Sequence, residues 1–133
     1  MRLISDTALA IATIYGEARG EDYRGKLAVA EVIRNRTKEK YASDGTIAGT
    51  VLRRLQFSCW NDGDPNRIVI AKLDDSDPAV QDCMTAWHDA NMNGTNVAKG
   101  ALLYYAPALV SPGWAKASME VARIGHHVFM VPH

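Results

Sequence analysis

Glu17 is the residue whose position best suits acid–base chemistry. It lies in the stretch Ile14–Glu21 and follows a run from Asp6 to Tyr15 with apolar side chains in almost every direction of a 3.6-residue period. A helix that is apolar on all sides is a buried helix. Partial desolvation and the negative end of the helix dipole disfavour the ionised form of a carboxyl group at such a helix end. The pattern therefore indicates a general acid.

Cys59 and the adjacent His126 and His127 are the second set of residues that could do chemistry. A cysteine and a histidine far apart in sequence can meet in a fold as nucleophile and base. No cysteine-peptidase signature surrounds Cys59, so we keep a cysteine hydrolase only as an alternative function. Neighbouring residues on a strand point to opposite faces, and no H-E-x-x-H or Cys/His set accompanies the histidines, so we expect no metal and no cofactor. The sequence does not decide whether Cys59 and Cys83 form a disulfide bond.

Two predicted helices position Glu17. Apolar and small residues between Gly25 and Arg36 follow helical spacing, which predicts an amphipathic helix with Lys26, Glu31, Arg34 and Asn35 largely on the opposite face. Gly20 suits a left-handed position just beyond the first helix. The turn between the helices is then a few residues long, and Glu17 lies beside the joint.

The remaining elements complete a mixed fold. We expect a short helix over 46–55, an irregular surface loop over 56–75, and a helix that begins at Asp77-Pro78 and ends at Gly94. Residues 101–105 and 119–131 are strand-like, with breaks at Pro107, Pro112 and Gly113. The order predicts an α+β domain, mainly helical, with a small antiparallel sheet near the C-terminus.

Composition narrows the class of protein. The 133 residues suit a single domain, 1–133, and fifteen basic residues balance fifteen acidic ones. A zero net charge provides no global field for nucleic acid or anionic lipid, so neither is an expected partner. The N-terminal residues form no long apolar run, and we expect neither a signal peptide nor membrane insertion.

The stretch around Glu17 resembles a known family. Its pattern reads roughly I-Y-G-E-A-R-G-E, then G-K-x-A-V-A-x-V-I-x-N-R, and the chain matches it through Arg36. This is similar to the catalytic domain of the spore cortex-lytic, SleB-type cell-wall hydrolases. Residues 100–107 resemble the family's G-A-x-Y-Y-x-N-P segment, and residues 124–129 its I-G-x-H-x-F ending, with Trp114 between them. Ala106 and Met130 depart from the usual Asn and Tyr.

The resemblance implies a lysozyme-like fold and cleavage of peptidoglycan glycan strands between N-acetylmuramic acid and N-acetylglucosamine. Glu17 would be the general acid and then the base of a lytic transglycosylase or muramidase. No second carboxylate is assured, since Glu21, Glu31 and Asp62 are only candidates. The expected substrate-binding residues, converging on Glu17 in one groove, are Glu21, Ser58, Trp60, Tyr104, Tyr105 and His127.

Two other functions remain open beside this one. One is a cysteine-dependent peptidoglycan peptidase or amidase. The other is a non-catalytic cell-wall-binding module that holds glycan on Trp60, Tyr104 and Tyr105, although Glu17 at the end of a buried helix argues against it. We expect a monomer that acts on the bacterial cell wall. The missing signal peptide suggests either a phage endolysin, held in the host cytoplasm until it is released, or a bacterial enzyme separated from its other modules.

Overall fold

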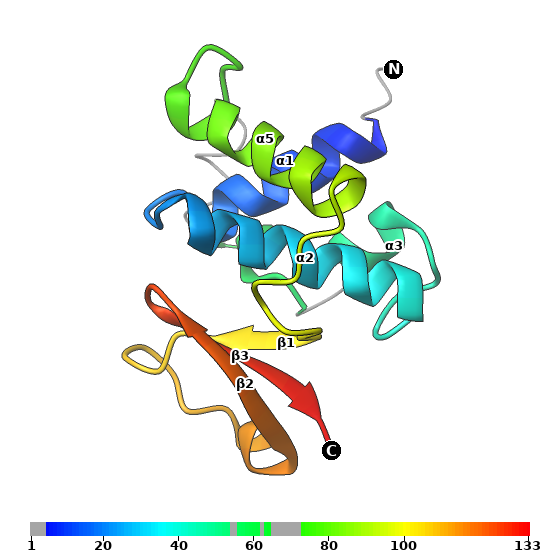
Figure 1. Cartoon of the computed structure of the whole chain (residues 1–133), viewed down its shortest axis with the longest axis vertical. Coiled ribbons are helices and arrows are strands. Elements are labelled where there is room, and N and C mark those ends of the chain that lie inside the picture. The colour runs from blue at the N-terminus through cyan, green and yellow to red at the C-terminus, as the bar shows by residue number, and fades with distance from the viewer. Residues whose placement is uncertain (1–4, 54–55, 62, 65–72) are drawn as a thin grey trace.

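The computed structural model describes residues 5–53, 56–61, 63–64 and 73–133, and in them a layer of helices lies against a three-stranded sheet (Figure 1). The helices are α1 (Asp6–Ala18), α2 (Tyr23–Glu39), α3 (Ile47–Val51) and α5 (Pro78–Met92), with short 3-10 turns η1 (Ser58–Trp60) and η2 (Gly113–Ala117). The strands are β1 (Leu103–Tyr105), β2 (Ser118–Ile124) and β3 (His127–Pro132). This confirms the expected mainly helical α+β fold.

Side-chain caps explain where the long helices begin. The Ser5 side chain accepts from the Ala8 N–H at 3.1 Å at the start of α1, and Asp22 accepts from the Gly25 N–H at 3.0 Å at the start of α2. Asp77 caps α5, where Pro78 occupies the first turn and gives up no helical hydrogen bond. No helix in the described ranges is long and apolar enough to cross a membrane.

Two local predictions were wrong. Gly20 does not adopt a left-handed conformation, because α1 ends at Arg19 in right-handed geometry and the Glu21 N–H continues the turn by bonding the Ala18 carbonyl. The helix expected over 46–55 ends at Val51, after Thr46 caps its start. Residues 54 and 55 lie outside the described part of the chain.

The polar residues of α2 were expected on a solvent face, but most are buried. Glu31 is fully buried and accepts from the backbone N–H groups of Val97 and Ala98, at 3.0 and 2.8 Å. Asn35 and Arg36 bind the next carbonyls, those of Ala101 and Leu102. Buried polar groups are tolerated because they satisfy backbone groups of a connecting segment. These contacts hold residues 95–102 across α2 on their way to β1 (Figure 1).

The sheet presents its inner residues to the helices. Its order is β1-β3-β2, antiparallel throughout, with Tyr104 opposite Phe129. Gly125, at a φ of 57°, forms the turn between β2 and β3. Tyr104, Ile124 and Phe129 pack in the same core as α1 and α2. The C-terminal end of α1 therefore faces the sheet at its first strand, β1.

Candidate active site

An open cavity of about 500 Å³ lies between the end of α1, η1 and β1, and the loop 106–112 forms its other side. Glu17 contributes the carboxyl group of this cavity. The lining residues come from widely separated parts of the chain: Gly16, Glu17, Arg36, Gln56, Ser58, Tyr104, Tyr105, Ala106, Leu109, Val110, Pro112, Trp114 and His127.

Three donors fix the Glu17 carboxyl group, which is half-buried. Its Oε2 accepts from Ser58 Oγ at 3.2 Å and from the Cys59 backbone N–H at 3.1 Å. Its Oε1 accepts from the Tyr104 hydroxyl at 2.6 Å. The side chain thus has one orientation, set by η1 on one side and β1 on the other.

Tyr104 is a neutral donor to Glu17 over a wide pH range. Burial, and then the Glu17 carboxylate, raise the pKa of the Tyr104 phenol well above its usual range. Its ring lies edge-on to His127, with centroids 5.0 Å apart, and is tilted against Phe129 at 5.6 Å. These two ring contacts help to hold the hydroxyl in place.

The cavity continues at both ends. A neighbouring cavity of about 370 Å³ shares Glu17, Ala106, Leu109 and His127 with it and adds Glu21. At the other end, a cavity of about 540 Å³ shares four lining residues and adds others, among them Tyr41 and His133; the shared residues are Arg36, Gln56, Tyr104 and Trp114. Because the central cavity shares lining residues with each of the other two, the three adjoin and form one groove, and Glu17 lines the central cavity and the 370 Å³ one. An extended polymer fits such a shape better than a small molecule does.

Most of the expected site residues meet in this groove. Ser58, Tyr104, Tyr105 and His127 line the central cavity with Glu17, whereas Glu21 lies at one end. The carboxylate of Glu21 is directed at the β2–β3 turn, and both of its oxygens contact His126 or its backbone.

Trp60 does not join the groove. Its indole N–H donates to Thr13 Oγ at 2.8 Å, and its ring packs against the hydrophobic core. The 3-10 turn η1 directs the side chain toward α1, where Trp60 closes the core.

Several groove residues escaped the sequence analysis. Trp114 is 38% exposed and lies edge-on to Tyr105, with ring centroids 5.6 Å apart. Leu109 and Val110 are 83% and 54% exposed on the rim. Two apolar side chains in a proline-bounded loop were a usable signal, because exposed apolar residues that gather at a cavity mark binding surfaces.

The thiols have a different environment from a catalytic cysteine. Cys59 and Cys83 are free and buried, so they form no bridge. Burial, and then Glu17, raise the pKa of the Cys59 thiol far above its usual range, and burial raises that of Cys83 to about 12. A nucleophilic cysteine needs a lowered pKa, and neither thiol has one.

Known proteins resemble this chain over nearly its whole length. It is 33% identical over 125 residues to the spore cortex-lytic enzyme of Halalkalibacterium halodurans and 32% identical to that of Oceanobacillus iheyensis. The alignments cover 94% of this chain but only 34% and 41% of those enzymes. The chain thus spans less than half the length of these curated relatives.

Two solved structures share the fold. The catalytic domain of the germination-specific lytic transglycosylase SleB from Bacillus anthracis superposes with a TM-score of 0.73 at 26% identity, over 95% of this chain and 93% of that one. The catalytic domain of the Bacillus cereus SleB protein also gives 0.73, at 27% identity, over 95% and 89%.

The model of the Cell Wall Hydrolase family matches residues 20–130. The matched residues begin after Glu17, so support for Glu17 comes from the geometry of the groove. Together with relatives aligned over 94% of its length, this match shows that the chain belongs to the SleB-type cell wall hydrolase family.

Proposed function

We propose that residues 1–133 act as one catalytic domain that cleaves the glycan strands of peptidoglycan, with Glu17 as the proton donor to the glycosidic oxygen. The observation that carries the proposal is the Glu17 carboxyl group, oriented by three donors, in a groove made of three adjoining cavities. Polymer cleavage needs binding surface on both sides of the reacting bond, and the groove provides it.

The hydrogen bonds suggest which Glu17 oxygen carries the proton. A carboxyl oxygen has two lone-pair positions, and Oε2 already accepts from Ser58 and Cys59. Oε1 accepts only from Tyr104 among the described residues, so it retains one position for a transferable proton. The same donors stabilise the carboxylate that forms when the proton leaves.

The proposed reaction has two steps. The bond between C1 of muramic acid and the bridging oxygen breaks as that oxygen takes the Glu17 proton. The 6-hydroxyl of the same muramic acid attacks C1, and its proton returns to the Glu17 carboxylate. The product is a 1,6-anhydro sugar, as in a lytic transglycosylase.

The groove supports transglycosylation over hydrolysis, because a two-carboxylate glycosidase needs a second free acid. Among the described lining residues, Glu21 is the other carboxylate, and both of its oxygens are directed at the hairpin turn. Glu31 is fully buried against Val97 and Ala98. Asp62 lies outside the described residues.

The relatives guide the choice of substrate. The curated ones are spore cortex-lytic enzymes, and the B. anthracis SleB domain is a germination-specific lytic transglycosylase. We therefore propose peptidoglycan of the cortex type as substrate. These relatives lend no support to the phage endolysin or to holding in a host cytoplasm that the sequence suggested, and neither is part of the proposal.

Mass spectrometry of digested walls tests this function. Purified protein incubated with cortex peptidoglycan should release muropeptides that end in anhydromuramic acid, which are lighter by one water than hydrolysis products. Products with reducing ends would indicate a muramidase. Free peptides with intact glycan would contradict the proposal and favour the cysteine peptidase.

A further inference from the structure

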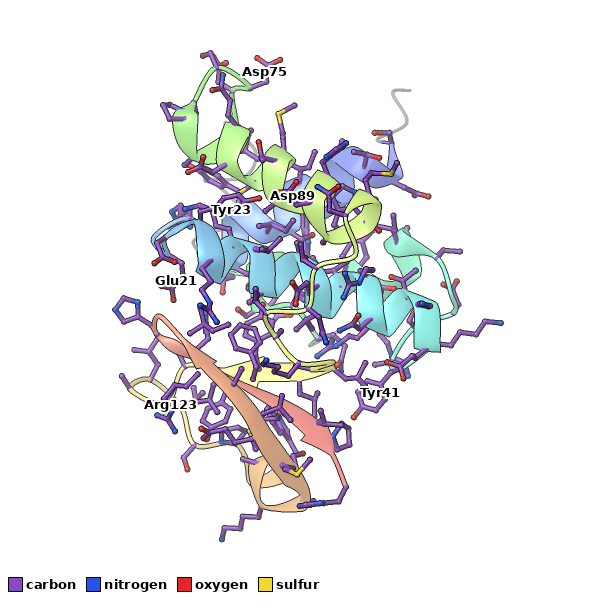
Figure 2. The ribbon with its side chains drawn as sticks, viewed as in Figure 1. Glu21, Tyr23, Tyr41, Asp75, Asp89 and Arg123 are labelled. Carbon is purple, nitrogen blue, oxygen red and sulfur yellow. The ribbon has the colours of Figure 1, made fainter. Side chains whose placement is uncertain are left out.

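Glu21 is a buried carboxylate that the proposed mechanism does not use. It is 9% exposed and lies at the junction of α1 and α2, where Figure 2 shows it beside the β2–β3 hairpin. Its Oε1 accepts from the His126 backbone N–H at 3.0 Å, and Oε2 lies 3.1 Å from His126 Nδ1. Glu21 therefore ties the hairpin turn to the helical layer.

Two glycines show how closely Glu21 is enclosed. A Cβ atom at Gly125 would lie 2.4 Å from Glu21 Oε2, and one at Gly25 would lie 2.7 Å from Glu21 Cβ. Neither position accepts a side chain without displacing part of Glu21, its Cβ at Gly25 and its carboxylate at Gly125. The Glu21 carbonyl also accepts from the buried Lys26 ammonium. Both the backbone and the side chain of Glu21 are thus fixed, which suits a residue that orients another.

That other residue is His127, which follows the turn and lines both the central cavity and the end cavity. Its side chain is 12% exposed, and its buried Nδ1 lies 3.2 Å from Glu21 Oε1. The separation suits a hydrogen bond, although the ring N–H is not aligned with the oxygen, and Nδ1 has no aligned partner among the described residues. Hydrogen bonds of active sites are often poorly aligned without substrate and tighten when substrate binds.

The proximity of a carboxylate oxygen to Nδ1 favours the tautomer that carries its proton there. The lone pair is then on Nε2, the nitrogen that can reach the groove. The ring rests edge-on against Tyr104, whose hydroxyl donates to Glu17, and lines the same cavity as Glu17, so the imidazole lies beside the proposed reaction centre.

We propose that Glu21 and His127 form an acceptor dyad, in which Glu21 fixes the Nδ1–H tautomer and His127 Nε2 accepts a hydrogen bond from a sugar hydroxyl bound next to Glu17. This inference rests on the proposed function. It makes Glu21 a positioning residue that acts through His127, in place of the direct substrate contact expected from the sequence. A fixed acceptor orients a substrate hydroxyl in a way that a freely rotating side chain does not.

The surroundings keep the imidazole neutral. Burial lowers the pKa of His127 below its usual range and outweighs the opposing effects of Glu21, on the α1–α2 connection, and Glu17, on α1. His126, on the same hairpin, lowers it further, while Tyr104 packs against the ring from β1. Arg36 lines the same cavity from α2. Below its lowered pKa, His127 gains a proton and loses its acceptor, so its contribution to activity persists below the usual histidine pKa of about 6.5 and is lost only as pH falls through the lowered pKa.

Two substitutions of His127 separate orientation from acceptance. His127→Asn retains a donor near the position of Nδ1 but has no atom at the position of Nε2, whereas His127→Gln can place an oxygen acceptor there. We expect His127→Asn to lower kcat/KM roughly 3- to 10-fold, the loss of one hydrogen bond, and His127→Gln to recover most of it. The matched control is His88→Asn, because His88 is exposed on α5.

¹⁵N NMR identifies the tautomer of His127 in the absence of substrate. In ¹⁵N-histidine-labelled protein at pH 7, the His127 signals, assigned by their loss in His127→Asn, should show a protonated Nδ1 and an unprotonated Nε2. Glu21→Gln should weaken that preference and lower kcat/KM with little change in melting temperature. A protonated Nε2 in the wild type, or equal kcat/KM for His127→Asn and wild type, would overturn the dyad.

Failure of the dyad is distinct from failure of the proposed function. If anhydro products form and Glu17→Gln is inactive while both His127 variants match the wild type, the dyad alone is wrong. If the wild type cleaves no glycan, the proposed function is wrong whatever the NMR spectrum shows, and the hydrogen-bond acceptance by His127 fails with it.

Discussion

Removing the Tyr104 hydroxyl tests how the groove stabilises charge on Glu17. In Tyr104→Phe the ring keeps its contacts with His127 and Phe129, and Glu17 Oε1 loses the donor that lies 2.6 Å away. The Tyr104 hydroxyl donates to a neutral Glu17 carboxylic acid before proton transfer and to the Glu17 carboxylate after it. Only the difference between those two hydrogen bonds affects the rate of the chemical step.

The magnitude follows from that difference. A hydrogen bond to a neutral group contributes about 0.5–1.5 kcal/mol and one to a charged group about 1.5–3 kcal/mol. A difference of about 1–1.5 kcal/mol corresponds to a roughly 5- to 13-fold decrease in kcat. KM should change little, because the hydroxyl is directed at Glu17 and away from the substrate.

Release of soluble muropeptides from a wall suspension, measured over a range of substrate concentrations, separates kcat from KM. Tyr23→Phe is the matched control, because its hydroxyl also donates to a carboxylate, that of Asp89, and Tyr23 lines none of the three cavities of the groove. A kcat for Tyr104→Phe within twofold of the wild type would refute the reasoning, as would a decrease that lies wholly in KM.

Three further predictions follow from the contacts of individual side chains. Cys59→Ser should retain most wall-lytic activity, because Cys59 binds Glu17 through its backbone N–H; complete loss with an unchanged circular dichroism spectrum would support a cysteine nucleophile instead. Trp114→Ala should raise KM roughly 2- to 13-fold, the range for about 0.5–1.5 kcal/mol of aromatic contact, with little change in melting temperature because Trp114 is 38% exposed; an unchanged KM would remove it from the binding surface. Glu31→Ala should lower the free energy of unfolding by about 2–6 kcal/mol, because it strands two buried N–H donors at about 1–3 kcal/mol each. Glu31→Gln should cost less because it keeps one acceptor, and equal urea midpoints for the two variants would contradict this account of α2.

The position of Glu17 could be predicted because it depends on local order. A helix from Asp6 and a capped helix after Asp22 are encoded by nearby residues, and together they place Glu17 at the joint. The Tyr104 bond to Glu17 could not be predicted in the same way, since the two residues are 87 positions apart and meet only when the sheet packs on the helices. The sequence indicated that Tyr104 binds sugar, whereas in the structure its hydroxyl donates a hydrogen bond to the Glu17 carboxyl group.

The positions of the α2 polar residues and of Trp60 both depend on tertiary contacts. Helical periodicity assigns Glu31 and Asn35 to solvent by polarity alone, but backbone groups of residues 95–102 satisfy them in the interior. Residue type alone does not distinguish Trp60, in the core, from Trp114, in the groove. Their surroundings differ because Thr13 accepts a hydrogen bond from the Trp60 indole in the core, whereas Trp114 lies two residues after Pro112 and lines the groove.

The most direct test of the central claim is the activity of Glu17→Gln. The amide keeps the shape of the side chain: its oxygen can accept from Ser58 and Cys59, and its nitrogen can donate to the Tyr104 oxygen. The fold should therefore persist, as judged by melting temperature, while the transferable proton is gone. Glu39→Gln, at the exposed end of α2, is the matched control.

The measurement is the initial rate of anhydromuropeptide release from cortex peptidoglycan. Loss of a general acid lowers rates roughly 10²- to 10⁴-fold, so the account predicts less than about a hundredth of the wild-type rate for Glu17→Gln and the full rate for Glu39→Gln. A folded Glu17→Gln variant that releases these products above about a hundredth of the wild-type rate would contradict the assignment of Glu17 as the acid.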